Sequence, residues 1–122
     1  MSKKILIIED DSFLQGLAST KLEKEGFAVR GAANGEEGLK LLTAEAPDLV
    51  LCDLIMPGTD GFAVLEAAQK NPATAKIPII VFSNLSEDKD IKRAKELGAA
   101  EYMVKSNFTL DELADKIKSI LK

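Results

Sequence analysis

Five short apolar segments, each followed by a stretch with helical spacing, constrain the fold of this 122-residue chain more than any other feature. The sequence predicts strands at residues 4–8, 27–33, 49–52, 77–82 and 101–104. Strands that alternate with helices in this way are typical of a parallel sheet covered by helices on both faces. We therefore expect an α/β fold in one domain, residues 1–122, which is long enough to bury a core of its own.

Polar residues mark where the five helices begin. Ser12 with Gln15 and Thr109 with Glu112 each match a capping box, in which two side chains satisfy free backbone N–H groups at the start of a helix. Asn34 is predicted to cap the second helix. The expected helices are 12–26, 34–46, 60–70, 86–97 and a last one that begins after Thr109.

The segment 49–52 runs without interruption into Asp53, and Met56-Pro57-Gly58 then signals a turn. An unbroken apolar run suits a strand buried on both faces, so Asp53 is expected at its carboxyl end, where ligands bind in open α/β sheets. A carboxylate there can ligate a metal or act as a nucleophile. It can equally well hydrogen-bond the following turn, and Asp53 alone leaves both interpretations open.

Other strands also end in chemically useful side chains. These are Glu9, Asp10 and Asp11 after the first strand, Ser83 after the fourth and Lys105 after the fifth. Carboxylates that converge repel one another unless a cation compensates them. The chain has no His, so oxygen ligands would favour Mg²⁺. Together with a hydroxyl and an ammonium group, this set suits the transfer of a phosphoryl group to Asp53.

Composition and charge argue against several classes of function. The net charge is −4 and the longest basic cluster is Lys3-Lys4, so we expect no direct contact with nucleic acid. Neither a signal peptide nor a stretch able to span a bilayer is evident, which favours a cytoplasmic protein with no membrane partner. The single cysteine, Cys52, lies in an apolar run and is expected to be a core side chain.

Four motifs together resemble the receiver domain of bacterial two-component response regulators over nearly the whole chain. They are IIEDD after the first strand, DLIMPGTDG around Asp53, VFS at the fourth strand and YMVK at the fifth. The resemblance, closest to a stand-alone receiver of the chemotaxis type, implies a flavodoxin-like, doubly wound sheet of five parallel strands in the order 2-1-3-4-5, with five helices.

The resemblance also implies a role for each matching residue. Asp53 would accept the phosphoryl group, Ser83 and Lys105 would contact it, and Ser83 and Tyr102 would form the switch. Glu9, Asp10, Asp53 and the backbone carbonyl of Ile55 would hold Mg²⁺. The implied function is a phosphorylation-dependent switch that a sensor histidine kinase or phosphotransfer protein phosphorylates and that signals to a downstream protein. Such a domain catalyses only its own phosphorylation and dephosphorylation.

Two positions depart from the family pattern. Asn84 replaces a small residue and is expected to restrict access of the phosphodonor. Ser106 replaces a proline, so the loop after Lys105 is expected to follow a different path. The sequence ends with its fifth helix and no output domain follows, so we expect a stand-alone receiver or one domain of a longer chain.

Three alternatives compete with a working receiver. A phosphatase of the haloacid-dehalogenase type would need a second acid where this chain has Ile55. A flavodoxin-type module would need a phosphate cradle where this chain has the acids of residues 9–11. A pseudo-receiver that binds partners without phosphorylation remains as the alternative.

Overall fold

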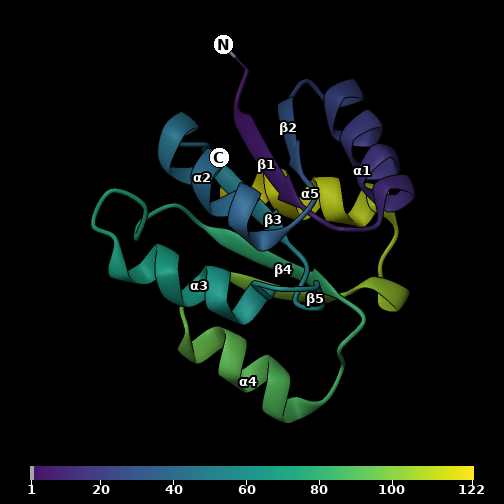
Figure 1. Cartoon of the computed structure of the whole chain (residues 1–122). Coiled ribbons are helices and arrows are strands. Elements are labelled where there is room, and N and C mark those ends of the chain that lie inside the picture. Colours follow the sequence, from purple (N-terminus) through teal and green to yellow (C-terminus); the bar gives the residue numbers. More distant parts are fainter. Residues whose placement is uncertain (1) are drawn as a thin grey trace.

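Five parallel strands form one sheet in the order β2-β1-β3-β4-β5 in a computed structural model of the chain, which describes residues 2–122 (Figure 1). The strands are β1 (Lys4–Ile8), β2 (Ala28–Ala32), β3 (Leu49–Cys52), β4 (Ile79–Ser83) and β5 (Glu101–Val104). This order confirms the predicted doubly wound topology. Because the order reverses beside β1, the carboxyl ends of β1 and β3 lie at a switch point, where such sheets bind ligands.

Helices cover both faces of the sheet. They are α1 (Ser12–Lys24), α2 (Gly35–Glu45), α3 (Gly61–Lys70), α4 (Asp88–Glu96) and α5 (Leu110–Ile120), with a short 3₁₀ turn, η1 (Lys105–Asn107), after β5. Helices α1 and α5 lie on one face, and α2, α3 and α4 lie on the other (Figure 1).

Alternate residues of each strand supply two separate cores. Ile5 and Ile7 of β1 pack in the cluster beneath α1 and α5, whereas Leu6 and Ile8 pack in the cluster beneath α2, α3 and α4. Successive side chains of a strand point to opposite faces, so a strand that is buried on both faces needs apolar residues at every position. This explains why the runs in the sequence show no polar alternation.

Some predicted boundaries were wrong by a few residues. Strand β4 begins at Ile79 instead of residue 77, because Pro78 has no N–H for the ladder and contributes its carbonyl to the N–H of Val50 instead (2.9 Å). Helix α4 begins at Asp88 instead of residue 86, since the first helical hydrogen bonds of its backbone go to the carbonyl of Glu87.

The first predicted capping box is wrong. Asp11 caps α1, and its Oδ1 accepts the N–H groups of Phe13 (3.0 Å) and Leu14 (3.1 Å), so Ser12 is already inside the helix. An Asp in the cap position satisfies these donors itself, which leaves the side chain of Gln15 free for other contacts. The second capping box, Thr109 with Glu112, is confirmed in both directions (2.9 and 3.1 Å).

The loop after Lys105 contains only trans peptide bonds, and Ser106 lies within η1. Among residues 2–122, no helix is long and apolar enough to cross a membrane.

Candidate functional site

The sheet brings the predicted site residues to one edge. Glu9 directly follows β1, and its N–H still donates to the carbonyl of Ala32 (3.0 Å). Asp53 directly follows β3, and its N–H donates to the carbonyl of Ile8 (3.0 Å). Lys105 directly follows β5. The strand ladders therefore place Glu9 and Asp53, and the end of β5 brings Lys105 to the same edge.

The Asp53 carboxylate is buried, with 7% of the residue exposed, and both of its oxygens are hydrogen-bonded. Oδ1 accepts the backbone N–H groups of Leu54 (2.7 Å) and Ile55 (3.3 Å), and Oδ2 accepts Lys105 Nζ (3.0 Å). Close behind it, α3 starts at Gly61, where a Cβ atom would lie 2.2 Å from the Asp53 carbonyl oxygen. Glycine is required at this position because the helix approaches the acidic strand end so closely.

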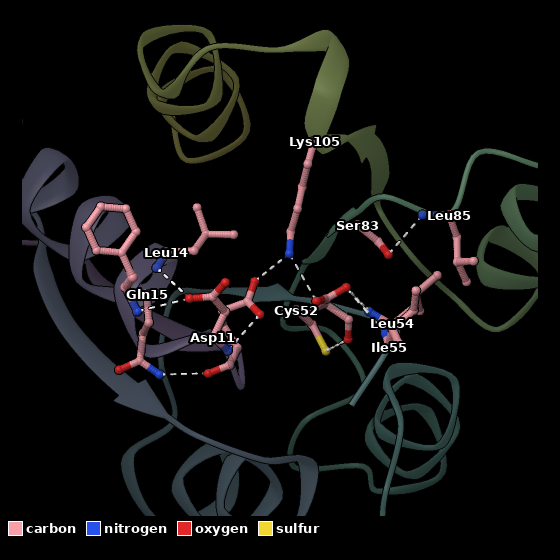
Figure 2. Close-up of polar contacts among 12 residues, drawn as sticks. Asp11, Leu14, Gln15, Cys52, Leu54, Ile55, Ser83, Leu85 and Lys105 are labelled. Atoms are coloured by element: carbon pink, nitrogen blue, oxygen red, sulfur yellow. Dashed lines mark hydrogen bonds and ion pairs between the residues drawn. The ribbon is translucent and has the colours of Figure 1, made fainter. Parts of the chain in front are cut away.

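Lys105 bridges two buried acids. Its Nζ lies 2.7 Å from Glu9 Oε1 and 3.0 Å from Asp53 Oδ2, and Figure 2 shows the side chain reaching from the end of β5 toward these carboxylates. Burial lowers the pKa of Lys105, but hydrogen bonds to Glu9 and Asp53 outweigh burial and leave that pKa raised. The side chain is therefore a cation at neutral pH and the positive pole of the site.

The surroundings of Glu9 disfavour its ionised form, so its pKa is raised. Burial raises its pKa, the hydrogen bond from Lys105 opposes this, and the charge of Asp53 adds to the rise. Its second oxygen, Oε2, accepts the N–H of Asp11 (3.2 Å). Glu9 is thus held in place although its charge is poorly compensated.

Three carboxylates lie close enough to share a metal ion. One oxygen each of Glu9, Asp10 and Asp53 falls within 4.8 Å of the others, and Asp10 is exposed to solvent. Lys105 contacts two of these acids, Glu9 and Asp53. All three acids offer oxygen ligands, which Mg²⁺ prefers. The residues fit a hard divalent cation. The Ile55 carbonyl as a further ligand stays a prediction, and the Ile55 N–H is occupied by Asp53.

Ser83 and Tyr102 meet at a residue that the sequence did not single out as their common partner. Ser83, which is fully buried, accepts the N–H of Leu85 at its hydroxyl (3.3 Å). Tyr102 donates its hydroxyl to the carbonyl of Leu85 (2.6 Å). Both candidate switch residues therefore act on the backbone of Leu85, in the loop between β4 and α4. Sequence patterns describe side chains, so a contact made through a main-chain amide leaves no signal in them.

Two further residues that the sequence singled out, Asn84 and Cys52, differ in their exposure. Asn84 is exposed in the loop after β4. Cys52 is a buried thiol whose pKa is raised by burial, and it packs in the core beneath α3 as predicted. A hollow of about 180 Å³ lies beside β1, β2 and α2 and is lined by none of the predicted site residues.

Comparisons with known proteins agree with this fold. The family model described as the response regulator receiver domain matches residues 5–118. The probable transcriptional regulator ycf27 of Porphyridium aerugineum is 38% identical over 120 residues, which cover 98% of this chain and 48% of that protein. The DNA-binding dual master transcriptional regulator RpaA of Synechocystis is 33% identical over 119 residues, covering 98% of this chain and 49% of RpaA.

A solved structure is similarly close. The putative response regulator from Chloroflexus aurantiacus superposes with a TM-score of 0.92 at 30% identity, and the match covers 99% of this chain and 98% of that one.

One sequence prediction is contradicted by these comparisons. Nucleic acid was excluded as a direct partner because no long basic cluster occurs among the 122 residues. RpaA, however, is named a DNA-binding regulator, and this chain spans about half the length of the curated relatives it matches. DNA binding depends on basic surfaces, and the charge argument applied only to the 122 residues of this chain.

Proposed function

This chain belongs to the response regulator receiver domain family, and on that premise we propose that Asp53 accepts a phosphoryl group from a histidine kinase or phosphotransfer protein. Phosphorylation-dependent signalling is what membership of this family implies. The proposal adds the acceptor, the roles of the neighbouring residues and the divalent cation.

The observation that carries the proposal is the double contact of Lys105 with Glu9 and Asp53 beside the exposed Asp10. A structural ion pair would need one acid for one base. Here a single ammonium group contacts two buried carboxylates, and a third carboxylate, that of Asp10, lies close to both at a switch point of the sheet. This arrangement favours a site that receives additional charged groups.

In the proposed reaction an oxygen of Asp53 attacks the phosphorus atom, and the bond between phosphorus and the donor breaks. Oδ1 is held by the N–H groups of Leu54 and Ile55, so the carboxylate keeps its orientation while Oδ2 exchanges partners. Lys105 is within reach of Oδ2 and can follow the charge onto a phosphoryl oxygen. Mg²⁺ held by Glu9, Asp10 and Asp53 would neutralise negative charge on the phosphoryl oxygens.

Ser83 would then respond to the new phosphoryl group. Its hydroxyl oxygen accepts the N–H of Leu85. The hydroxyl proton would be donated to a phosphoryl oxygen, which is a strong acceptor because it is charged. Movement of Ser83 would alter the Leu85 backbone and hence the partner of the Tyr102 hydroxyl. The pseudo-receiver alternative has no support in this site, because the acids, Lys105 and Ser83 all lie at the same edge. The cytoplasmic location stays a prediction.

The test is the intact mass of the protein after incubation with a small acyl phosphate and Mg²⁺. We expect one phosphoryl adduct on the parent and none on Asp53→Asn. Asp11→Asn is the matched control, because asparagine also caps helices and the adduct should persist. An adduct of full yield on Asp53→Asn would contradict the assignment of the acceptor.

A further inference from the structure

The side-chain amide of Gln15 joins the ends of two strands. Its Nε2 donates to the carbonyl of Glu9 (3.0 Å) and to the carbonyl of Ala32 (2.9 Å), so both of its hydrogens are used. The carbonyl of Ala32 also accepts the N–H of Glu9. Gln15 thus ties α1 to β1 and β2 at the point where β1 gives way to the acidic loop, and Figure 2 shows its amide directed at a main-chain oxygen.

Gly31 leaves the space that this amide occupies. A Cβ atom at Gly31 would lie 2.2 Å from Gln15 Oε1 and 2.7 Å from its Cδ, so any side chain at residue 31 would displace the amide. Gly16, the next residue of α1, has no atom within 4 Å of its own Cβ position. The absence of a side chain therefore matters at Gly31 and is incidental at Gly16.

The backbone that Gln15 holds also carries the acids of the site. The carboxylates of Glu9 and Asp10 extend from this segment, and each shares a cluster with Asp53. Like charges at this distance repel, and the repulsion is relieved if the segment moves away from Asp53. A bond to the Glu9 carbonyl from a residue in the first turns of α1 opposes this movement.

We propose that Gln15 is a positioning residue of the metal site, which keeps Glu9 and Asp10 at the distance from Asp53 at which Mg²⁺ binds. The inference rests on the proposed function, because it assigns Gln15 a role toward the same cation. Groups that orient metal ligands typically contribute 10- to 100-fold in affinity, and we expect roughly tenfold here.

The first measurement is Mg²⁺ titration followed by NMR of the backbone amides of residues 9–11 and 53–55. Gln15→Ala and Gly31→Ala should each weaken Mg²⁺ binding roughly tenfold. The variant that carries both substitutions should bind Mg²⁺ only slightly more weakly than Gln15→Ala does. In this variant the Gln15 amide that the new methyl group at residue 31 would displace is already absent. Gly16→Ala, in the same helix, is the matched control and should bind as the parent does.

The second measurement needs no metal. In metal-free buffer the N–H of Glu9 should exchange with solvent faster in Gln15→Ala than in Gly16→Ala, because its acceptor, the Ala32 carbonyl, loses the tie to α1. Gln15→Met keeps the length of the side chain but has no N–H donor, and it should behave as Gln15→Ala does. This variant distinguishes the loss of the hydrogen bonds from the loss of side-chain packing.

Phosphorylation by a small acyl phosphate separates positioning from damage to the fold. At saturating Mg²⁺ the rate in Gln15→Ala should return to near the parent's, whereas at low Mg²⁺ it should fall roughly tenfold. Equal Mg²⁺ affinity in the parent, Gln15→Ala and Gln15→Met would overturn the inference alone. A parent that binds no Mg²⁺ would overturn the proposed function and this inference with it.

Discussion

At the scale of single residues, the main feature of the site is that two buried carboxylates share one ammonium group. Glu9 and Asp53 are 5% and 7% exposed, and both depend on Lys105. Glu9 costs the fold free energy when it is ionised, because burial and the charge of Asp53 both favour its protonated form.

This cost has a defined dependence on pH. The pKa of Glu9 is raised above its ordinary value of 4.5, so the folded chain binds this proton more tightly than the unfolded chain does. By linkage, the contribution of Glu9 to the free energy of unfolding increases as the pH falls from neutral through the raised pKa and levels off below 4.5.

We therefore predict that Glu9→Gln is more stable than the parent at pH 7 in metal-free buffer. The difference should shrink as the pH approaches 4.5, since the parent then carries a neutral Glu9 of the same shape. Urea unfolding of both proteins across this range measures it. The lowered pKa of Glu25, caused by Lys118 and Lys21, acts only below 4.5 and does not overlap this range. A difference that stays constant with pH would contradict the explanation.

At the scale of elements, α4 has the fewest buried residues of the five α-helices. Ala94 is its one buried residue, and its N-cap, Glu87, makes no side-chain hydrogen bond to the helix. The helix also makes a cation–π contact, in which the guanidinium of Arg93 lies 4.1 Å from the ring centroid of Phe62, at the start of α3. This contact couples α4 to the helix that follows the Asp53 loop.

Removal of this contact should be measurable as a coupling energy. We expect a double-mutant cycle of Arg93→Ala and Phe62→Leu to give about 0.5–1 kcal/mol in the free energy of unfolding, as is usual for cation–π pairs near the surface. Lys92→Ala, the exposed neighbour on the same helix, is the control and should show no coupling to Phe62. Additive effects of Arg93→Ala and Phe62→Leu would show that the stacking contributes nothing.

The sequence predicted those elements that are determined by the types of neighbouring side chains. Strand β3 and the capping box at Thr109 are of this kind, and both were predicted correctly. The capping residue of α1 was predicted wrongly, because Asp11 and Ser12 are both good capping residues and only the backbone decides between them. The side chains of Gln15 and Tyr102 donate to main-chain carbonyls of Glu9, Ala32 and Leu85, and no local pattern reports such contacts.

The same distinction applies to the site. Its acids and Lys105 could be predicted because parallel strands place their carboxyl ends together, so strand order alone brings residues 9, 53 and 105 to one edge. The bridging of two acids by Lys105 could not be predicted, because it depends on the reach of individual side chains across the sheet.

At the scale of the whole molecule, phosphorylation at Asp53 should change the structure at residues distant from Asp53. Ser83 and Tyr102 both hydrogen-bond the backbone of Leu85, and the loop that contains Leu85 leads into α4, which has Ala94 as its one buried residue. We predict that hydrogen exchange on phosphorylation changes most in residues 83–97 and 101–105, as a shift of population between two packings. In Tyr102→Phe, which removes only the hydroxyl, the change in residues 101–105 should be reduced. Changes confined to residues 53–60 would contradict this route.

The position of Lys105 also has a consequence for how the chain acquires its structure. The ammonium group that compensates Glu9 comes from the far end of the sequence, 96 residues later. A partial sheet of β1 to β4 would hold Glu9 and Asp53 close together with no lysine between them, so the carboxylates would repel in a dehydrated setting. The arrival of β5 removes that repulsion in the same step that completes the sheet. We expect this late neutralisation to disfavour partly assembled intermediates and to make folding of the domain close to all-or-none.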